Sequence, residues 1–188
     1  VNAGNSIASG GNYNTVVGDE AGTAITTGDY NTALGYQAGT AVTTGLYNVA
    51  VGGASLLANT TGASNVAVGT STLAANTTES SNTAVGYSSL NANTTGTLNT
   101  AVGKDAGLSV TTGVQNTLIG GLAGDGTDDG VNNVAVGYGA LSANCTDNNT
   151  ALGHGAGGSV ESGGNVLIGT NTGVDTTALT SGQNNTLV

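Results

Sequence analysis

The sequence predicts an all-β protein, a single-chain β-solenoid (a β-roll) of about ten 17-residue coils. Three observations support this prediction: a short motif recurs at fixed spacing, the composition favours strands and turns, and apolar residues compensate for one another within each coil. Short repeats that contact only their neighbours are the signature of solenoids. Residues 1–188 therefore form one repeat domain, with incomplete half-coils at 1–13 and 185–188.

The repeated motif is Asn, any residue, two small or aliphatic residues, and Gly. Eight copies follow one another at steps of 17 residues, and they begin at Asn14, Asn31, Asn48, Asn65, Asn82, Asn99, Asn116 and Asn133. Two more begin at Asn149 and Asn165 after steps of 16, and a partial copy begins at Asn185 after a step of 20. We number the positions of each coil from this Asn, which is position zero.

The first segment of each coil is expected to be a strand. Thr or Val stands at +1, usually Ala at +2, an aliphatic residue at +3 and Gly at +4. Side chains alternate along a strand, so zero and +2 share one face while +1 and +3 share the other. We expect the +3 column to fill the coil interior, the Asn residues to form a hydrogen-bonded column of amides, and Gly to occupy a tight turn.

The second half of each coil shows a compensation between positions +8 and +11. Coils with Gly at +8 tend to have Ile or Val at +11, as in Gly39 and Val42, whereas coils with Leu at +8 have Asn at +11, as in Leu56 and Asn59. This pattern predicts one core pocket that is filled from either of two backbone positions. The Thr-Thr-Gly at +12 to +14 is expected to end a second strand and to enter a turn.

Composition and charge exclude several functions. Lys104 is the only cation against 11 acidic residues, a net charge of −10, so the chain cannot neutralise nucleic-acid phosphates or an anionic membrane surface. No apolar run is long enough for membrane insertion. Cys145 and His154 are single and fall at different coil positions, which gives neither a nucleophile–base pair nor a zinc site, so we expect no enzyme.

The two end segments are complementary halves of one coil. Ala3, Gly4 and Ile7 match the second half of a coil, whereas the last four residues match its first strand: Asn185, Thr186, Leu187 and Val188. Residues 185–188 and 1–13 together make one period of 17. One hypothesis is head-to-tail assembly of copies into a filament, because a heterologous contact that does not close generates one. The alternative is that the chain is a window from a longer repeat protein.

The segment from Asn82 to Tyr87, Asn-Thr-Ala-Val-Gly-Tyr, resembles the head repeats of YadA-like trimeric autotransporter adhesins and the repeats of phage tail fibres. This resemblance implies a left-handed coil, a homotrimer as an alternative to the head-to-tail polymer, and an extracellular, cell-surface or virion-borne fibre. We therefore expect a structural fibre subunit. The alternative is an adhesin or tail-fibre segment that binds a surface glycan or receptor. Tyr13, Tyr30 and Tyr47 at −1 could offer an aromatic stripe for this, although we favour a Tyr ladder that covers the coil edge.

Two further sets of residues are candidates for ligands or modification. Asp125, Asp128 and Asp129 cluster in a turn and could supply the oxygen ligands that Ca²⁺ prefers, with a solvated acidic loop as the alternative; no other cofactor is indicated. The N-glycosylation pattern Asn-x-Ser/Thr occurs at the same coil position in four coils. These candidates are Asn59, Asn76, Asn93 and Asn144.

Overall fold

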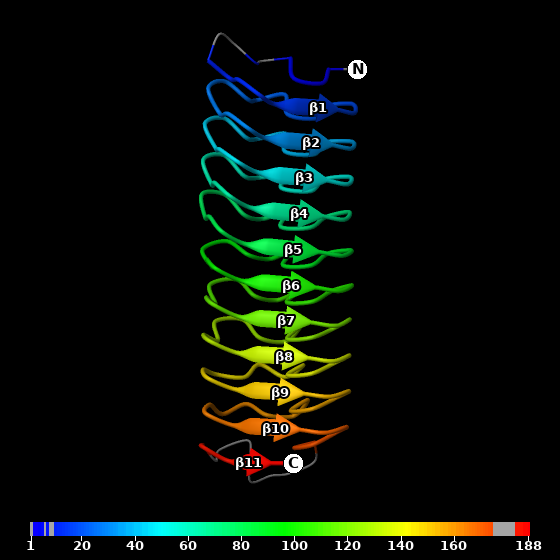
Figure 1. The fold of residues 1–188 in the computed structure, drawn as a ribbon, viewed down its shortest axis with the longest axis vertical. Coiled ribbons are helices and arrows are strands. Elements are labelled where there is room, and N and C mark those ends of the chain that lie inside the picture. Colours follow the sequence, from blue (N-terminus) through cyan, green and yellow to red (C-terminus); the bar gives the residue numbers. More distant parts are fainter. Residues whose placement is uncertain (1, 6, 8–9, 175–182) are drawn as a thin grey trace.

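The computed structural model describes residues 2–5, 7, 10–174 and 183–188, and these residues contain no helix. They form one parallel sheet of 11 strands in sequence order (Figure 1). The strands are β1 (Thr15–Val17), β2 (Thr32–Leu34), β3 (Val49–Val51), β4 (Val66–Val68), β5 (Thr83–Val85), β6 (Thr100–Val102), β7 (Thr117–Ile119), β8 (Val134–Val136), β9 (Thr150–Leu152), β10 (Val166–Ile168) and β11 (Thr186–Leu187). The β-solenoid of about ten coils is confirmed.

Every strand pairs with the equivalent strand of the next coil. Thr83 pairs with Thr100 and Val85 with Val102, so partners stand one period apart in sequence. The longer step before β11 keeps this register, because Val166 pairs with Thr186. Figure 1 shows the result, a straight rod in which the strands lie in a column and the turns extend to either side.

The expected direction of the strand side chains is wrong. The +2 residues point inward, with Ala84 and Ala101 fully buried, whereas the +3 residues face outward, with Val17 54% and Leu34 45% exposed. The Asn at position zero shares the inward face and is buried from β2 to β10. A small +2 residue suits this narrow interior, because the +8 or +11 side chain reaches across the coil and fills the space above it.

The predicted core pocket is confirmed, and the structure adds a third way to fill it. Leu56 at +8 and Val42 at +11 are both buried in their coils. In the coil that begins at Asn116, neither position carries an aliphatic residue, and Leu118 at +2 is fully buried there instead. A Cβ on Gly124, at +8 of that coil, would lie 2.6 Å from Leu118 Cδ2, so the Leu side chain occupies the pocket.

Two features of the structure, the backbone conformation and the close approach of the next coil, require Gly at +4. Its φ lies between 124° and 139° throughout the stack, a region that side chains disfavour. A Cβ on Gly86 would also lie 2.3 Å from the carbonyl oxygen of Gly103, its equivalent in the next coil. The glycine column thus lets successive turns stack in contact.

The coils that the structure describes throughout, from Asn14 to Gly164, each have one strand and not two. The Thr-Thr-Gly segment, expected to end a second strand, is a turn in the structure. It still bonds to its neighbour, since the Thr26 amide donates to the Thr43 carbonyl at 3.0 Å. Inter-coil hydrogen bonds therefore also run along the rod outside the sheet.

Candidate functional site

The predicted column of amides runs inside the rod from β1 to β11. The backbone amide of Asn82 donates to Asn65 Oδ1 at 3.0 Å, and the amide of Asn99 donates to Asn82 Oδ1 at 3.0 Å. Asn82 Nδ2 donates to the Gly96 carbonyl at 2.8 Å, which closes its own coil. Asn82 thus satisfies buried polar groups both along the rod and within the coil, as buried groups require, whereas the buried Nδ2 of Asn133 has no hydrogen-bond partner. The prediction of an amide ladder is confirmed.

A second, shorter ladder lies at +11. Asn76 Nδ2 donates to Asn59 Oδ1 at 2.9 Å and Asn93 Nδ2 donates to Asn76 Oδ1 at 3.0 Å. The ladder stops at Asn93, whose buried Oδ1 has no hydrogen-bond partner, because the next coil has Val110 at +11. The sequence pattern indicates only that Asn stands at +11 where Leu at +8 fills the pocket, and the bonds between these Asn residues were not predicted from it.

Three of the four glycosylation candidates belong to this second ladder. Asn59, Asn76 and Asn93 are fully buried, and their Nδ2 atoms donate within the rod, so a glycan there could be attached only before the coil closes. Asn144 is exposed. Its 16-residue coil is one residue short, and Cys145 takes the buried place that Asn occupies in the 17-residue coils with Leu at +8.

The proposed assembly residues continue the repeat at both ends of the rod. The Gly4 amide donates to the Ala21 carbonyl at 2.9 Å, and Gly4 has the positive φ of other +8 glycines. At the other end, Asn185 Nδ2 donates to Asn165 Oδ1 at 2.9 Å. Leu187 packs half-buried against the core and Val188 is 93% exposed. In this sheet, β1 and β11 are the two edge strands.

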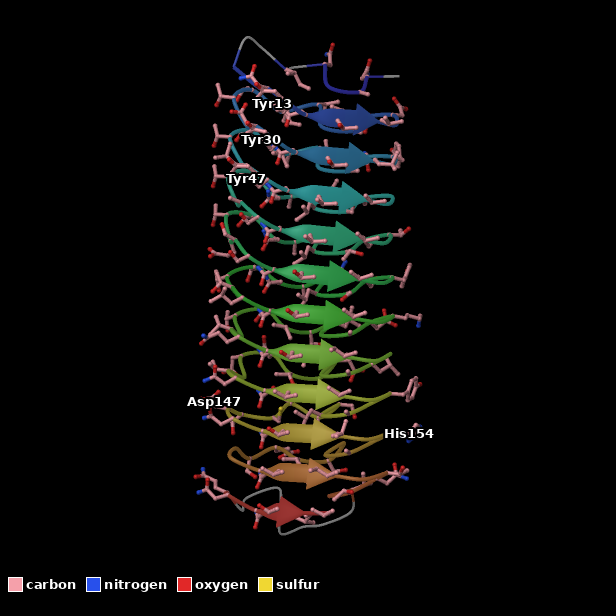
Figure 2. All side chains as sticks on the ribbon, viewed as in Figure 1. Tyr13, Tyr30, Tyr47, Asp147 and His154 are labelled. Atoms are coloured by element: carbon pink, nitrogen blue, oxygen red, sulfur yellow. The ribbon has the colours of Figure 1, made fainter. Side chains whose placement is uncertain are left out.

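Three tyrosines form a stack on one side of the rod. Tyr13 and Tyr30 have ring centroids 4.8 Å apart, and Tyr30 and Tyr47 are 5.1 Å apart, with interplanar angles of 13° and 11°. All three are exposed and lie one above another (Figure 2). Because ring faces stack on one another along the rod, the solvent meets mainly ring edges and hydroxyl groups. The stack covers a coil edge and also offers an exposed aromatic surface.

The three carboxylates of the predicted calcium turn lie in different environments. Asp125 is half-buried, and this burial raises its pKa, whereas Asp128 and Asp129 are exposed. Asp128 accepts a hydrogen bond from Thr111 Oγ1 in the previous coil. Among the described residues, no group of three or more His, Cys, Asp and Glu residues is placed to hold a metal ion. Calcium binding stays a prediction that calorimetric titration with Ca²⁺ and EDTA tests.

The two residues with catalytic potential lie in different environments. Cys145 is buried beside Thr127, with Sγ 3.4 Å from Oγ1, and burial raises the pKa of its thiol. His154 is exposed and stacks on Tyr138 with ring centroids 5.5 Å apart. Figure 2 shows His154 projecting from the turn that follows the strands.

The rod defines the class of this chain as a parallel β-solenoid repeat protein. Comparison with protein-family models, curated proteins and solved structures finds no match for the chain. Across the part of the chain that the structure describes, no helix is both long and apolar enough to cross a membrane.

Proposed function

We propose that this chain is a structural subunit of an extracellular fibre, assembled head to tail. The observation that supports the proposal is the buried Asn ladder, which bonds each coil to the next from β1 to β11. A body in which every coil makes the same contacts with its neighbour grows in one dimension. Such a rod suits a spacer or filament at a cell surface or on a virion.

The joint between copies follows from bonds that recur between coils. At the β5–β6 boundary, the Thr83 amide donates to the Asn99 carbonyl and the Gly103 amide donates to the Val85 carbonyl, both at 2.8 Å. In the proposed joint, Thr186 and Val188 of one copy take the places of Thr83 and Val85. Their partners in the next copy are Asn14 and Gly18, and the Asn14 amide donates to Asn185 Oδ1.

The substitution Thr186→Pro tests this joint. Pro lacks the backbone amide with which residue 186 donates across the proposed joint. The edge strand itself tolerates Pro, because this amide has no partner strand within its own copy. Thr186→Val is the matched control, since Val occupies +1 in other coils. We expect filaments in electron micrographs of the native chain and of Thr186→Val, and separate rods about 50 Å long for Thr186→Pro. Separate rods for all three would contradict the proposal.

The Tyr stack supports a second candidate function, adhesion to a surface glycan or receptor. Aromatic rings contribute binding energy at exposed recognition surfaces. A glycan-array screen of the native chain tests this alternative, with Tyr30→Ser as the variant because Ser stands at −1 in the coils of Asn65 and Asn82. Binding that Tyr30→Ser abolishes would favour the adhesin, whereas no binding to the array would count against it.

A further inference from the structure

The outer face of the sheet carries an aliphatic column that the coil's own core does not use. Position +3 is Val, Leu or Ile in all ten full coils. These side chains are exposed or half-buried, and Leu152 near the end of the column is still 49% exposed. A soluble monomer seldom presents such a continuous apolar stripe, so the stripe needs a physical reason.

Strand propensity does not supply that reason. Val, Ile and Thr all favour strands. At +1, on the same face, Thr occupies seven of eleven coils. At +3, Thr occurs in none, and Leu, which is not β-branched, occurs at Leu34 and Leu152. The +3 column is therefore specifically apolar.

The same face carries no charge. Positions +1 and +3 contain none of the 11 acidic residues, and the single Lys also stands elsewhere. The nearest charged positions are at +5, where Asp19 and Lys104 lie beside the face. A chain with a net charge of −10 thus keeps one long face whose two central columns, +1 and +3, carry no charge.

The dimensions of the face fit a second copy. Eleven strands at about 4.8 Å give a length of about 50 Å, and the face with its flanking −1 and +5 columns covers roughly 1,000 Å². A stable interface needs roughly 800 Å² per partner. An identical rod has the same coil spacing, so its +3 side chains can interdigitate along the whole length, as between packed sheets.

We propose that the outer sheet face, the +1 and +3 columns of β1 to β11, pairs two rods side by side. The described residues form a single sheet, which offers one flat self-complementary face and so a two-fold contact, whereas a three-fold ring requires two different faces on each copy. This lateral contact is separate from the end-to-end joint, and fibres that use both are double rods.

The test uses Thr186→Pro as the background, so that axial growth does not add mass. Val68→Asp with Val102→Asp places two charges in the +3 column. The control, Thr61→Asp with Thr95→Asp, adds the same charges at exposed positions in the turns. We expect sedimentation equilibrium to give twice 17.8 kDa for the background and the control, and 17.8 kDa for the +3 variant. Circular dichroism checks that all three are folded.

Two results would overturn the proposal. One is a background that sediments as a monomer or a trimer, and the other is a +3 variant that stays dimeric while folded. If Asp at +3 prevents folding, Val68→Thr with Val85→Thr and Val102→Thr keeps the β-branched shape and removes only the apolar surface. These variants are expected to raise the dimer dissociation constant at least tenfold, and an unchanged constant would reject the proposal. X-ray scattering distinguishes the axial joint, which lengthens the rod, from lateral pairing, which thickens it.

Discussion

At the scale of single residues, the Asn at position zero ties the fold together. Its Oδ1 accepts from the backbone of the next coil and its Nδ2 donates to the far side of its own coil, as Asn82 shows. An apolar side chain at this position would leave buried groups such as the Asn99 amide without a partner. Such groups each cost about 1–3 kcal/mol when left unpaired.

Asn82→Ala is therefore expected to lower the free energy of unfolding by about 1–3 kcal/mol, because the buried Asn99 amide loses its partner, while the Gly96 carbonyl keeps the bond from Asn93 Nδ2. Urea denaturation followed by circular dichroism measures the change. The control is Asn144→Ala, at an exposed Asn, for which we expect less than about 1 kcal/mol. Equal losses for the two variants would show that the ladder does not stabilise the rod.

Cys145 gives a pH-dependent prediction. Burial raises the pKa of its thiol in the folded chain, so the unfolded chain releases this proton at lower pH. Above the ordinary thiol pKa of about 8.5, the unfolded state binds fewer protons and stability falls as pH rises. The stability difference between the native chain and Cys145→Ala should shrink between about pH 8 and about pH 10. A stability difference that stays constant or grows over this range would contradict a raised thiol pKa of Cys145 in the folded chain.

At the scale of the coil, the sequence predicts much of the structure because each element repeats. The strand, the Gly turn, the Asn column and the shared pocket all follow from residue types that recur at one spacing. The sequence does not show which face of the strand points into the coil. Thr-Ala-Val has an apolar residue on each face, and hydrophobicity alone would place Val, not Ala, in the interior. Burial of Asn is favourable only when the neighbouring coil supplies its partners, which a single coil does not show.

Two features of the coil left signals in the sequence that went unused. Leu118 and Leu167 are the only Leu residues at +2 among the full coils, and they stand in the coils without an aliphatic residue at +8 or +11. That coincidence could have identified the +2 position as part of the core. The burial of Cys145 in place of Asn144 had a weaker signal, the one-residue shortening of that coil.

The shared pocket predicts that two substitutions compensate for each other. Val42→Asn alone empties the pocket and should cost about 2–4 kcal/mol, and Gly39→Leu alone overfills it at a cost of about 1–3 kcal/mol. Together they recreate the neighbouring coil of Leu56 and Asn59, and the new Asn extends the second ladder. We expect the double variant to lie within about 1 kcal/mol of the native chain in a double-mutant cycle. Additive losses would contradict the shared pocket.

At the scale of the whole molecule, the rod is a one-dimensional stack whose length follows the number of coils. Contacts between strands join only neighbours in the stack. Stability in such arrays is a sum over coils and the interfaces between them. Among the described strands, no contact between distant coils fixes the number of coils, so we expect the rod to tolerate the removal of one complete coil.

Deletion of residues 65–81 removes one period and joins two coils of the same type. We expect a folded rod that is about 5 Å shorter, the spacing of one strand, and X-ray scattering in the Thr186→Pro background measures this length. Deletion of residues 65–73 is the control, because it removes half a period and breaks the register. A full-period deletion that unfolds the chain as thoroughly as the half-period deletion would contradict the repeat account.

The central claim is that the coil stack continues from one copy into the next. Helical reconstruction of native fibres from electron micrographs tests it most directly. The account predicts an axial rise per subunit of eleven coils, about 53 Å, with the strand spacing of about 4.8 Å unbroken across the joint. A different subunit rise, or a gap in the strand spacing at the joint, would contradict it.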